Sequence, residues 1–595
     1  MSTSINARIT SFRKQMRNLK LDAYIIPSSD EHQSEYVCDR SKVRAWISGF
    51  DGSAGTAVVT SDHAGLWTDS RYFLQAEEQL ADNEFQLHKI IKQGTPEFIT
   101  WLCDNLPKNS IVGCDGILFS KSQIEKYEKI LVQADIQLKS SVDFIDEIWD
   151  DRPSLPSAKI YEHDVFYTGE SRETRLNMLR SKFQEDADGY LLTALDDIAW
   201  LFNLRGADVE SNPVFLSYAI VQKSNAILFV ESSKISEEIQ SRLIKDNVKL
   251  APYESILAYL NNLDKNYVLH VSASDISMSM YKAINGKIHS GENYIRTAKG
   301  IKNSTEIGHI KRVMEKDGVA LTRMYMWLEE TLKSRKVKET EVRDMLIKYR
   351  SEQEGYIGES FGAIVGYKSN GAIIHYSPQE STCAEISNDG MLLVDSGGQF
   401  LDGTTDTTRT IHLGTPTVEE KKAFTLVLKG YISLDLAKFP HGTHGIQLDT
   451  LARMHLWEQG MNYGHGTGHG VGFLLNVHEA PQGYAPIWGV RSKTVLQPGM
   501  VTSNEPGFYK VGGFGIRIEN LLLTVEDEKN EYGNFLSHET LTLFPIEIKL
   551  IDETLMTARE KAWFNRYHAE VYKRLSLHLD DHEQKWLRMK CRPLN

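Results

Sequence analysis

Two segments of the N-terminal half repeat the same order of apolar and polar stretches, and this repeat constrains the fold more than any other feature. The first begins with DAYIIP at Asp22, passes Trp46 and the alternating run TAVVT, and ends in a helical stretch from Arg71. The second begins with DGYLLT at Asp188, 166 residues later, and passes Trp200, AIVQKSNAILFVE and the helical stretch SKISEEIQSRL. The shared order of strand and helix patterns predicts two copies of one α/β domain.

Prolines separate the two copies. The stretch DDRPSLPSAK contains Pro153 and Pro156, and proline ends helices and favours extended chain. A second boundary is expected near KGIKNST, where a long amphipathic helix begins. We therefore expect domain I at residues 1–155, domain II at 156–303 and a large third domain at 304–595, in a chain of the α/β (α+β) class.

The helix that opens the third domain has a clear apolar face. Ser304 is predicted to cap its N-terminus, because a serine side chain accepts hydrogen bonds from the first backbone N–H groups of a helix. The apolar residues follow at helical spacing on one face: Ile307, Ile310, Met314 and Leu321.

Composition excludes several classes of protein. Apolar residues make up 41% and charged residues 25% of the chain, as in ordinary soluble globular proteins. No run approaches about eighteen consecutive apolar residues, so no segment is expected to span a membrane. The 67 basic and 80 acidic residues give a net charge of −13 with no basic block, which argues against a nucleic-acid partner. Five irregularly spaced cysteines and a start without a secretory signal predict a cytoplasmic protein.

The first group of candidate site residues lies in MLLVDSGGQFLDGTTDTTRTIHLG. An apolar strand runs into Asp395, and a second strand carries Asp406. A hairpin turn at Asp402-Gly403 would put both carboxylates on the same face of the sheet. That register leaves them about four residues, or roughly 13 Å, apart along the strand, so a bulge or a longer turn must bring them together if they share one site. Two such aspartates also fit ordinary turn or edge positions.

Glycine and histidine alternate in YGHGTGHGVGFLLNVHEAP. Glycines at 464, 466, 468, 470 and 472 would cost a helix about 5 kcal/mol at roughly 1 kcal/mol each, so the segment is predicted to be extended or looped. In extended chain His465 and His469 point to the same side, and His478 follows the apolar run FLLNV. Glycines let the backbone approach a ligand closely and leave the imidazoles accessible, so the segment is predicted to be part of a site.

The third group lies in VTSNEPGFYKVGGFGIRIEN. A hairpin with the three-residue loop Val511-Gly512-Gly513 would set Glu505 directly opposite Glu519. Opposed residues on paired strands have β-carbons about 5 Å apart, and two carboxylates at that distance repel unless a cation or a proton lies between them. The pair therefore favours a metal ion, although two solvated acids on an exposed hairpin would show the same pattern.

Together the three segments offer four carboxylates, at least one imidazole and no thiolate. Oxygen-rich donor sets with some nitrogen suit manganese, zinc, cobalt or iron, and the excess of carboxylates favours manganese. Five protein ligands are too many for one catalytic zinc, which takes about three and keeps an open position. Two divalent cations about 3.5 Å apart, bridged by carboxylates, would use all five ligands and generate a hydroxide at neutral pH.

Other catalytic signatures are missing from the sequence. No G-x-G-x-x-G follows a strand, and there is no G-x-x-x-x-G-K-[ST], no H-E-x-x-H and no G-x-S-x-G. A cysteine nucleophile is not excluded by spacing, but nothing marks any of the five cysteines as activated.

The candidate ligands resemble those of the M24, or pita-bread, metallopeptidases in identity and order: Asp395, Asp406, His469 within GHGTGHGVG, Glu505 in NEPG and Glu519 in GIRIEN. Within that family, the chain is similar to the long, three-domain X-prolyl aminopeptidases over nearly its whole length. The matching stretches include IIPSSDEHQSEY, SGFDGSAGTAVVT, WTDSRYFLQAE, LDDIAWLFNLRG, NPVFLSYAI, GAIIHYSP and DGTTDTTRT. The resemblance implies two related creatinase-like α/β domains followed by a C-terminal pita-bread catalytic domain.

The activity implied by the resemblance is that of a metal-dependent exopeptidase. Such an enzyme releases the N-terminal residue from peptides with proline in the second position, using a hydroxide held by two metal ions. The implied cofactor is a pair of divalent ions per chain, Mn²⁺ in preference to Zn²⁺ or Co²⁺. The resemblance also implies a cytosolic homodimer whose other partner is the peptide substrate.

The resemblance further implies a role for each ligand. Asp395 and Asp406 would hold one ion, and His469 with Glu505 the other. Asp406 and Glu519 would bridge both ions. Glu505 would also act as the general base on the bridging water.

Contacts with the substrate are implied for residues outside the ligand set. His375 in IIHYSP, His465 and His478 would contact the peptide, and His478 would hydrogen-bond near the scissile bond while the tetrahedral intermediate forms. Arg517 in GIRIEN would support the site from behind the ligands. Arg71 in WTDSRYF would reach the substrate from domain I.

Two departures from the family pattern stand out. Phe400 replaces a frequent tyrosine, and QGYAPIWGVRSKTVLQPG, between His478 and Glu505, matches less well, which leaves the preferred peptide length open. The main alternative activity is that of a prolidase, which cleaves dipeptides ending in proline with the same ligand set. A second alternative is a non-catalytic pita-bread binding protein, but such proteins lose ligands and all five are present here.

Overall fold

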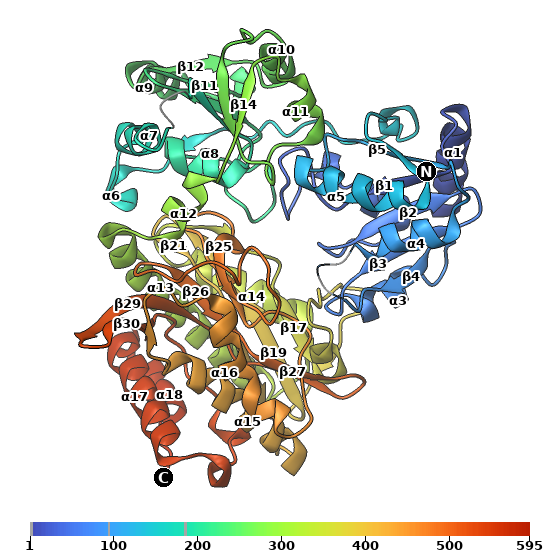
Figure 1. Cartoon of the computed structure of the whole chain (residues 1–595). Helices are drawn as coiled ribbons and strands as arrows, with labels where there is room; N and C mark the ends of the chain where they lie inside the picture. Colours follow the sequence, from blue (N-terminus) through green and yellow to red (C-terminus); the bar gives the residue numbers. More distant parts are fainter. Residues whose placement is uncertain (1–3, 93, 95, 184–186) are drawn as a thin grey trace. The chain divides into compact units, whose positions relative to one another are not determined.

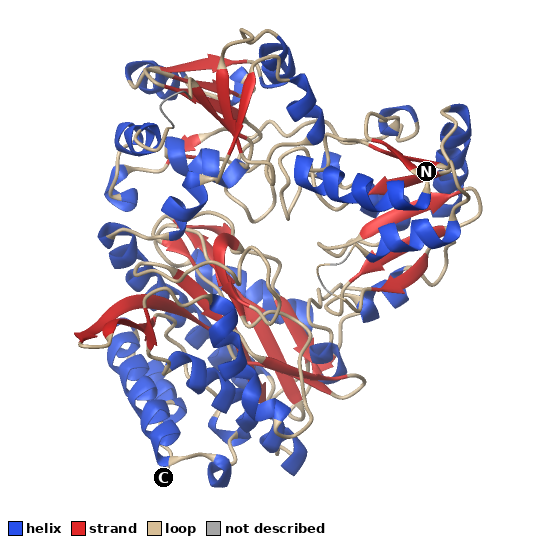
Figure 2. Cartoon of the chain, in the orientation of Figure 1, coloured by secondary structure: helices blue, strands red, loops and turns tan. Residues whose placement is uncertain are grey.

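The computed structural model describes residues 4–92, 94, 96–183 and 187–595 (Figure 1). Its contacts divide the chain into two compact units, Met1–Val165 with Glu170–Ile295 and Phe166–Gly169 with Arg296–Asn595. Both units mix helices and strands (Figure 2), which confirms the predicted α/β class. The domain boundaries at 155/156 and 303/304 stay predictions. Within the described ranges, no helix is both long enough and apolar enough to cross a membrane.

The first sheet of the first unit has six strands: β1 (Ala23–Ile26), β2 (Thr56–Thr60), β3 (Ala64–Thr68), β4 (Gln86–Lys89), β5 (Ile111–Cys114) and β6 (Gln137–Lys139). Their order is β4-β3-β2-β1-β5-β6, with β1 antiparallel to β2 and parallel to β5. The helices between them are α1 (Ile5–Asn18), α2 (Val43–Ser48), α3 (Phe73–Gln79), α4 (Glu97–Asn105) and α5 (Lys121–Leu131).

Strand β1 is buried along its whole length because helices cover both faces of the sheet. Tyr24 and Ile26 pack in a core cluster with apolar residues of α1. Ala23 and Ile25, which point the other way, pack with apolar residues of α4 and α5. The continuous apolar run of the first sequence segment therefore forms a central strand.

The second sheet repeats the first strand for strand. Its members are β8 (Gly189–Leu192), β10 (Tyr218–Gln222), β11 (Ala226–Phe229), β12 (Val248–Ala251), β13 (Val268–Val271) and β14 (Lys287–Ser290). The order is β12-β11-β10-β8-β13-β14, with β8 antiparallel to β10 and parallel to β13. Because β1 and β8 begin the two similar sequence segments, the predicted internal repeat is confirmed.

Short elements complete this part of the chain. A separate strand pair is formed by β7 (Tyr161–Glu162) and β9 (Leu204–Arg205). The helices of the second copy are α7 (Arg172–Arg180), α8 (Leu195–Phe202), α9 (Glu237–Lys245), α10 (Ile256–Asn261) and α11 (Met278–Ala283). The chain passes between the units at α6 (Val165–Thr168) and α12 (Tyr294–Gly300).

The largest sheet of the second unit has the order β23-β30-β29-β26-β24-β25. Its strands are β23 (Phe439–Pro440), β24 (Gly468–Gly470), β25 (Glu479–Tyr484), β26 (Val501–Asn504), β29 (Asn520–Asn530) and β30 (Gly533–Thr540). Helices of the same unit are α13 (Ser304–Thr331), α14 (Glu339–Ser351), α15 (Val418–Asp435), α16 (Gly445–Trp457), α17 (Ala558–Leu575) and α18 (Asp581–Lys590). A core cluster joins residues of α13, α15, α17 and α18 to β26 and β29.

Smaller sheets of the second unit carry the aspartate and glutamate hairpins. A three-stranded sheet consists of β17 (Ile364–Tyr367), β19 (Met391–Ser396) and β22 (Thr407–His412), and another of β16 (Tyr356–Glu359), β20 (Gly398–Phe400) and β21 (Gly403–Thr404). Two pairs are formed by β27 (Gly507–Lys510) with β28 (Phe514–Arg517), and by β15 (Val337–Lys338) with β18 (Glu385–Ile386).

Helix α13 begins where the sequence predicted, but its cap is Asn303 and not Ser304. The Asn303 side chain accepts hydrogen bonds from the backbone N–H groups of Thr305 and Glu306, and the Glu306 side chain accepts from the N–H of Asn303. This reciprocal capping box satisfies more backbone donors than a single serine cap would, and it makes Ser304 the first helical residue.

The hairpin that carries Asp395 and Asp406 turns one residue earlier than predicted. We expected the turn at Asp402-Gly403, whereas the two turn residues are Leu401-Asp402. Gly403 instead begins β21 with φ of 141°, a conformation that glycine adopts readily and other residues do not. The register that follows sets Asp406 opposite Gly397, so the two aspartates are about two residues apart along the strands instead of four.

The hairpin between Glu505 and Glu519 confirms the predicted register. Strands β27 and β28 are joined by the three-residue loop Val511-Gly512-Gly513, and Gly507 pairs with Arg517. Strands β26 and β29 continue the same register on the far side of the two glutamates. Glu505 and Glu519 therefore lie opposite each other in the interval between two ladders.

Gly397 is required for the close approach of the strands that carry the aspartates. A β-carbon at this position would lie 1.9 Å from the Thr405 carbonyl oxygen and 2.3 Å from Ser360 Oγ. The Thr405 oxygen belongs to the backbone and cannot move without shifting Asp406. Glycine therefore sets the spacing of the two carboxylates.

We expect Gly397→Ala to lower the free energy of unfolding by about 2 kcal/mol or more, because the added methyl group forces the hairpin apart. Gly362→Ala is the matched control, since a β-carbon there meets nothing within 4 Å. Denaturant unfolding of both variants measures the difference. Equal midpoints for the two variants would show that the close approach is not needed.

Candidate metal centre

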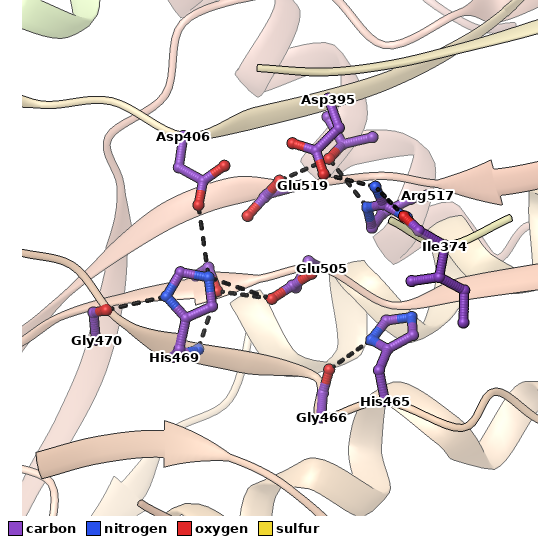
Figure 3. A network of polar contacts seen from close by, with 12 residues as sticks. Ile374, Asp395, Asp406, His465, Gly466, His469, Gly470, Glu505, Arg517 and Glu519 are labelled. Carbon is purple, nitrogen blue, oxygen red and sulfur yellow. Dashed lines mark hydrogen bonds and ion pairs between the residues drawn. The ribbon is translucent and has the colours of Figure 1, made fainter. Parts of the chain in front are cut away.

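The five predicted ligands lie in strands β19 and β24 or directly beside strand ends, and they converge on one region of the second unit (Figure 3). One ligand atom each from Asp406, His469 and Glu519 lie within 4.8 Å of one another. His469 Nε2 is 3.5 Å from Asp406 Oδ2 and 3.4 Å from Glu505 Oε1. Asp395, at the end of β19, lies beside Glu519 in the same view.

The orientation of His469 leaves its outer nitrogen toward the carboxylates. Its Nδ1 lies 2.9 Å from the Gly470 carbonyl oxygen, which can only accept, so Nδ1 carries the proton. Nε2 then carries the lone pair and faces Asp406 and Glu505. A backbone acceptor on one imidazole nitrogen is the usual way in which a protein orients a metal-binding histidine.

Arg517 holds Asp395 in place. Its guanidinium donates to Asp395 Oδ2 at 2.5 Å, to Tyr509 Oη at 2.7 Å and to the Ile374 carbonyl oxygen at 3.4 Å. The arginine is 2% exposed, so these contacts are made away from water. The second oxygen, Asp395 Oδ1, is buried and has no hydrogen-bond partner among the described residues.

Thr408 orients the Glu519 side chain. The Thr408 hydroxyl donates to Glu519 Oε2 at 2.6 Å, and the backbone N–H of Glu519 donates to the Thr408 carbonyl oxygen at 3.2 Å. Both residues are buried. One Glu519 oxygen is therefore fixed by a neutral donor while the carboxylate remains close to Asp406 and His469.

Burial raises the pKa values of three of these carboxyl groups. Desolvation is the largest cause for each, and neighbouring carboxylates add to it. The pKa of Glu505 rises to about 7, against the opposing effect of Arg517 and His478. The pKa values of Asp406 and Glu519 also lie well above the usual range. The carboxylates of the cluster therefore carry more negative charge than Arg517 alone can balance.

This donor set fits divalent cations. A buried group of carboxylates is stable in its ionised form only near compensating positive charge. The buried Asp395 Oδ1 and the Nε2 lone pair of His469 both offer atoms that a cation binds. Four carboxylates and one imidazole suit ions such as manganese, zinc or cobalt.

The three other predicted histidines lie around this cluster. The rings of His469 and His478 have centroids 4.3 Å apart. His465 Nε2 is 2.9 Å from Tyr509 Oη, the same hydroxyl that accepts from Arg517. His375 follows Ile374, whose carbonyl oxygen also accepts from Arg517. Their contacts with substrate stay predictions.

Arg71 belongs to the first unit. Its guanidinium donates to both oxygens of Asp69, with Nε–Oδ1 and Nη2–Oδ2 distances of 2.8 Å. The predicted contact between Arg71 and the substrate stays a prediction.

Two residues that the sequence reasoning missed lie beside the ligands. Tyr509 and Thr408 follow Glu505 and Asp406 at even spacing along extended chain. Because side chains alternate along a strand, this spacing could have indicated that they share a face with the ligands. A third missed residue, Arg453, lies on α16, and its sequence position gives no comparable signal.

Four segments of the sequence match family models. Residues 308–526 match Metallopeptidase family M24, and residues 534–594 match the C-terminal region of peptidase M24. Residues 8–148 and 151–306 each match the Creatinase/Prolidase N-terminal domain. The two N-terminal matches coincide with the two related six-stranded sheets.

Relatives cover the chain from end to end. It is 43% identical to a probable Xaa-Pro aminopeptidase P of Laccaria bicolor, over 99% of this chain and 93% of the relative. It is 40% identical to aminopeptidase P2 of Arabidopsis thaliana, over 99% and 89%. The fold is similar to the crystal structure of X-prolyl aminopeptidase from Caenorhabditis elegans, described as a cytosolic enzyme with a dinuclear active site, with a TM-score of 0.95, 34% identity and full coverage of both chains. The chain therefore belongs to metallopeptidase family M24, with two creatinase/prolidase N-terminal domains ahead of the M24 domain.

Proposed function

We propose that the chain is an Xaa-Pro aminopeptidase, which releases the N-terminal residue from peptides with proline in the second position. The observation that carries this proposal is the convergence of all five ligand side chains in a chain whose full-length relatives bear that name. The complete ligand set argues against a binding protein that has lost its chemistry.

The substrate explains why metal ions are useful here. A peptide bond before proline is a tertiary amide without an N–H, so an enzyme that binds extended backbone through hydrogen bonds loses one contact. The bond must then be recognised through its carbonyl oxygen and through the free amine of the first residue. Cations and fixed donors near the carbonyl compensate for the missing contact.

We propose two divalent cations per chain, with Mn²⁺ as the metal. Asp395 and Asp406 would hold one, His469 and Glu505 the other, and Glu519 with Asp406 would be shared between them. When bound, such a pair supplies a water-derived nucleophile at neutral pH and polarises the scissile carbonyl. The excess of carboxylates over imidazole supports manganese over zinc.

Glu505 is the proposed general base. Its carboxylate faces the other ligand side chains, where it can accept a proton from the nucleophilic water and pass it on. The proton passes to the nitrogen of the departing proline, which as a tertiary amide nitrogen needs protonation to leave. In the metal-free protein, burial among other carboxylates raises the pKa of Glu505 to about 7.

The other side chains position the peptide. His478, beside His469, donates to the developing negative charge on the carbonyl oxygen. His375 and His465 contact the peptide, and the carbonyl of Ile374 and the His465 imidazole both contact the Arg517–Tyr509 pair. Arg71 contributes substrate contacts from the first of the two N-terminal domains.

We also propose a homodimer and a cytosolic location. The free thiols of all five cysteines agree with a reducing compartment. The similar nematode enzyme is described as cytosolic.

The first prediction from the proposed function concerns the substrate and the metal. The purified protein should cleave Arg-Pro-Pro at least about 100-fold faster than the dipeptide Gly-Pro, and a chelator should remove the activity. Mn²⁺ added back should restore more activity than Zn²⁺ because of the carboxylate-rich donors. Faster cleavage of Gly-Pro would instead identify a prolidase.

The second prediction concerns the base. Glu505→Ala should lower kcat on Arg-Pro-Pro by about 10³-fold or more, because it removes both a ligand and the proton acceptor. Circular dichroism should show that the variant stays folded. Glu531→Ala, in the exposed turn between β29 and β30, is the control and should keep normal activity. Normal turnover by Glu505→Ala would exclude the proposed role.

The third prediction concerns pH. In the metal-free protein Glu505 keeps its proton up to about pH 7, whereas an ordinary glutamate releases it near pH 4.5. Folding takes up protons in that window, so the free energy of unfolding should fall as pH rises through it. Cations compete with these protons, so Mn²⁺ affinity should rise over the same window.

Thermal unfolding of the chelated protein and Mn²⁺ titration between pH 5 and pH 8 measure both trends. Glu505→Gln cannot ionise at this position, so it should weaken the dependence of Tm on pH. A Mn²⁺ affinity that does not change with pH would contradict the buried acidic cluster.

A further inference from the structure

A buried arginine on α16 contacts the glycine-rich segment that carries His465. Arg453 is 1% exposed. Its Nη1 donates to the Tyr463 carbonyl oxygen at 2.9 Å, and its Nη2 donates to the His465 carbonyl oxygen at 2.7 Å. The guanidinium carbon also lies 3.9 Å from the centroid of the Tyr463 ring. The Arg453 side chain thus hydrogen-bonds to the backbone on both sides of Gly464.

Asp449, one helical turn earlier, fixes this guanidinium. Its carboxylate accepts from Arg453 Nε at 2.6 Å and from Arg453 Nη2 at 3.2 Å. The same carboxylate accepts from the Thr467 hydroxyl at 2.6 Å, and the Tyr463 hydroxyl lies 2.6 Å from the Thr467 oxygen. All of these groups are buried. The helix therefore holds the segment at three successive points.

The held segment leads directly to two proposed catalytic residues. The Thr467 carbonyl oxygen accepts from the backbone N–H of Glu505 at 2.8 Å. His465 reaches Tyr509 Oη through Nε2 at 2.9 Å, and its Nδ1 lies 2.7 Å from the Gly466 carbonyl oxygen. A shift of this backbone would therefore move the His465 imidazole.

The glycine content of this segment explains why side chains of α16 are needed to fix its backbone. Gly464, Gly466 and Gly468 have no side chains to pack, and glycine loses more conformational freedom on ordering than other residues. A planar guanidinium with five donors can satisfy two carbonyl oxygens and a carboxylate at the same time. A lysine ammonium at the same place would keep the charge but not that geometry.

We propose that Arg453, oriented by Asp449, is a positioning residue for His465 and hence for recognition of the peptide. It touches neither the ligands nor the substrate, and it acts by fixing the backbone of residues 463–467. This inference rests on the proposed function, because the effect on recognition is read with an Xaa-Pro peptide.

Arg453→Lys tests the proposal. We expect KM for Arg-Pro-Pro to rise about tenfold while kcat stays within about threefold, because a misplaced His465 weakens binding of substrate and transition state alike. Bound manganese per chain should not change. A purely structural role would instead lower the fraction of active protein, and with it the apparent kcat, and leave KM as it was.

Two further variants sharpen the test. In a His465→Ala background, Arg453→Lys should add less than about twofold to KM, because the two changes act through the same side chain. Arg175→Lys is the matched control, since Arg175 is also fully buried and also donates to a backbone carbonyl, that of Trp200 at 2.7 Å, in the first unit. It should lower Tm without changing KM.

A crystal structure of Arg453→Lys gives a readout that does not depend on activity. The proposal expects the His465 imidazole to move away from Tyr509. An unchanged KM, additive effects of Arg453→Lys and His465→Ala, or an unmoved His465 would each overturn it. If the wild-type protein fails to cleave any Xaa-Pro peptide, the proposed function falls, and the position of His465 in the crystal still decides whether Arg453 acts as a clamp.

Discussion

Repulsion among buried carboxylates is the constraint on which the second unit depends. Asp406 and Glu519 are buried and Glu505 beside them is mostly buried, and loss of solvent with mutual repulsion raises the pKa of each. Such a cluster costs folding free energy unless protons or cations neutralise it. The metal-free protein is therefore less stable than it would be without the cluster, and the cluster strongly prefers to bind divalent ions. The same constraint raises the pKa of Glu505 to about 7 in the metal-free protein.

Backbone geometry restricts which amino acids can occupy the positions around the cluster. The strands around it approach more closely than side chains allow, so glycine is needed at the points of contact. A β-carbon at Gly397 would meet the Thr405 carbonyl oxygen at 1.9 Å, and one at Gly468 would meet the Ser503 carbonyl oxygen at 1.8 Å. Both contacts lie next to ligand-bearing backbone. The glycines that exclude a helix in the histidine segment thus also determine how near the ligand strands come.

Local pattern predicted the repeat and the glutamate pair because both depend on short-range rules. Two similar runs gave two identical sheet orders, and a three-residue loop fixed Glu505 opposite Glu519. The aspartate hairpin was mispredicted by one residue, because Asp402-Gly403 is a strong turn signal while Gly403 serves the strand. The contact of Arg453 with the His465 segment could not be predicted, since it joins a helix to a loop through tertiary packing that leaves no periodicity in the sequence.

Three buried arginines fix the backbone at or next to site residues. Arg517, Arg409 and Arg453 are all nearly inaccessible to water, and each donates to a backbone carbonyl next to or at a site residue, namely those of Ile374, Glu519 and His465. Arg517 also pairs with Asp395, and Arg453 with Asp449, so in these two residues a carboxylate compensates the guanidinium charge while the carbonyl contacts fix the backbone. Replacing these arginines by apolar side chains of similar size would remove both effects. Rigid positioning and electrostatic balance therefore have one physical origin in this unit.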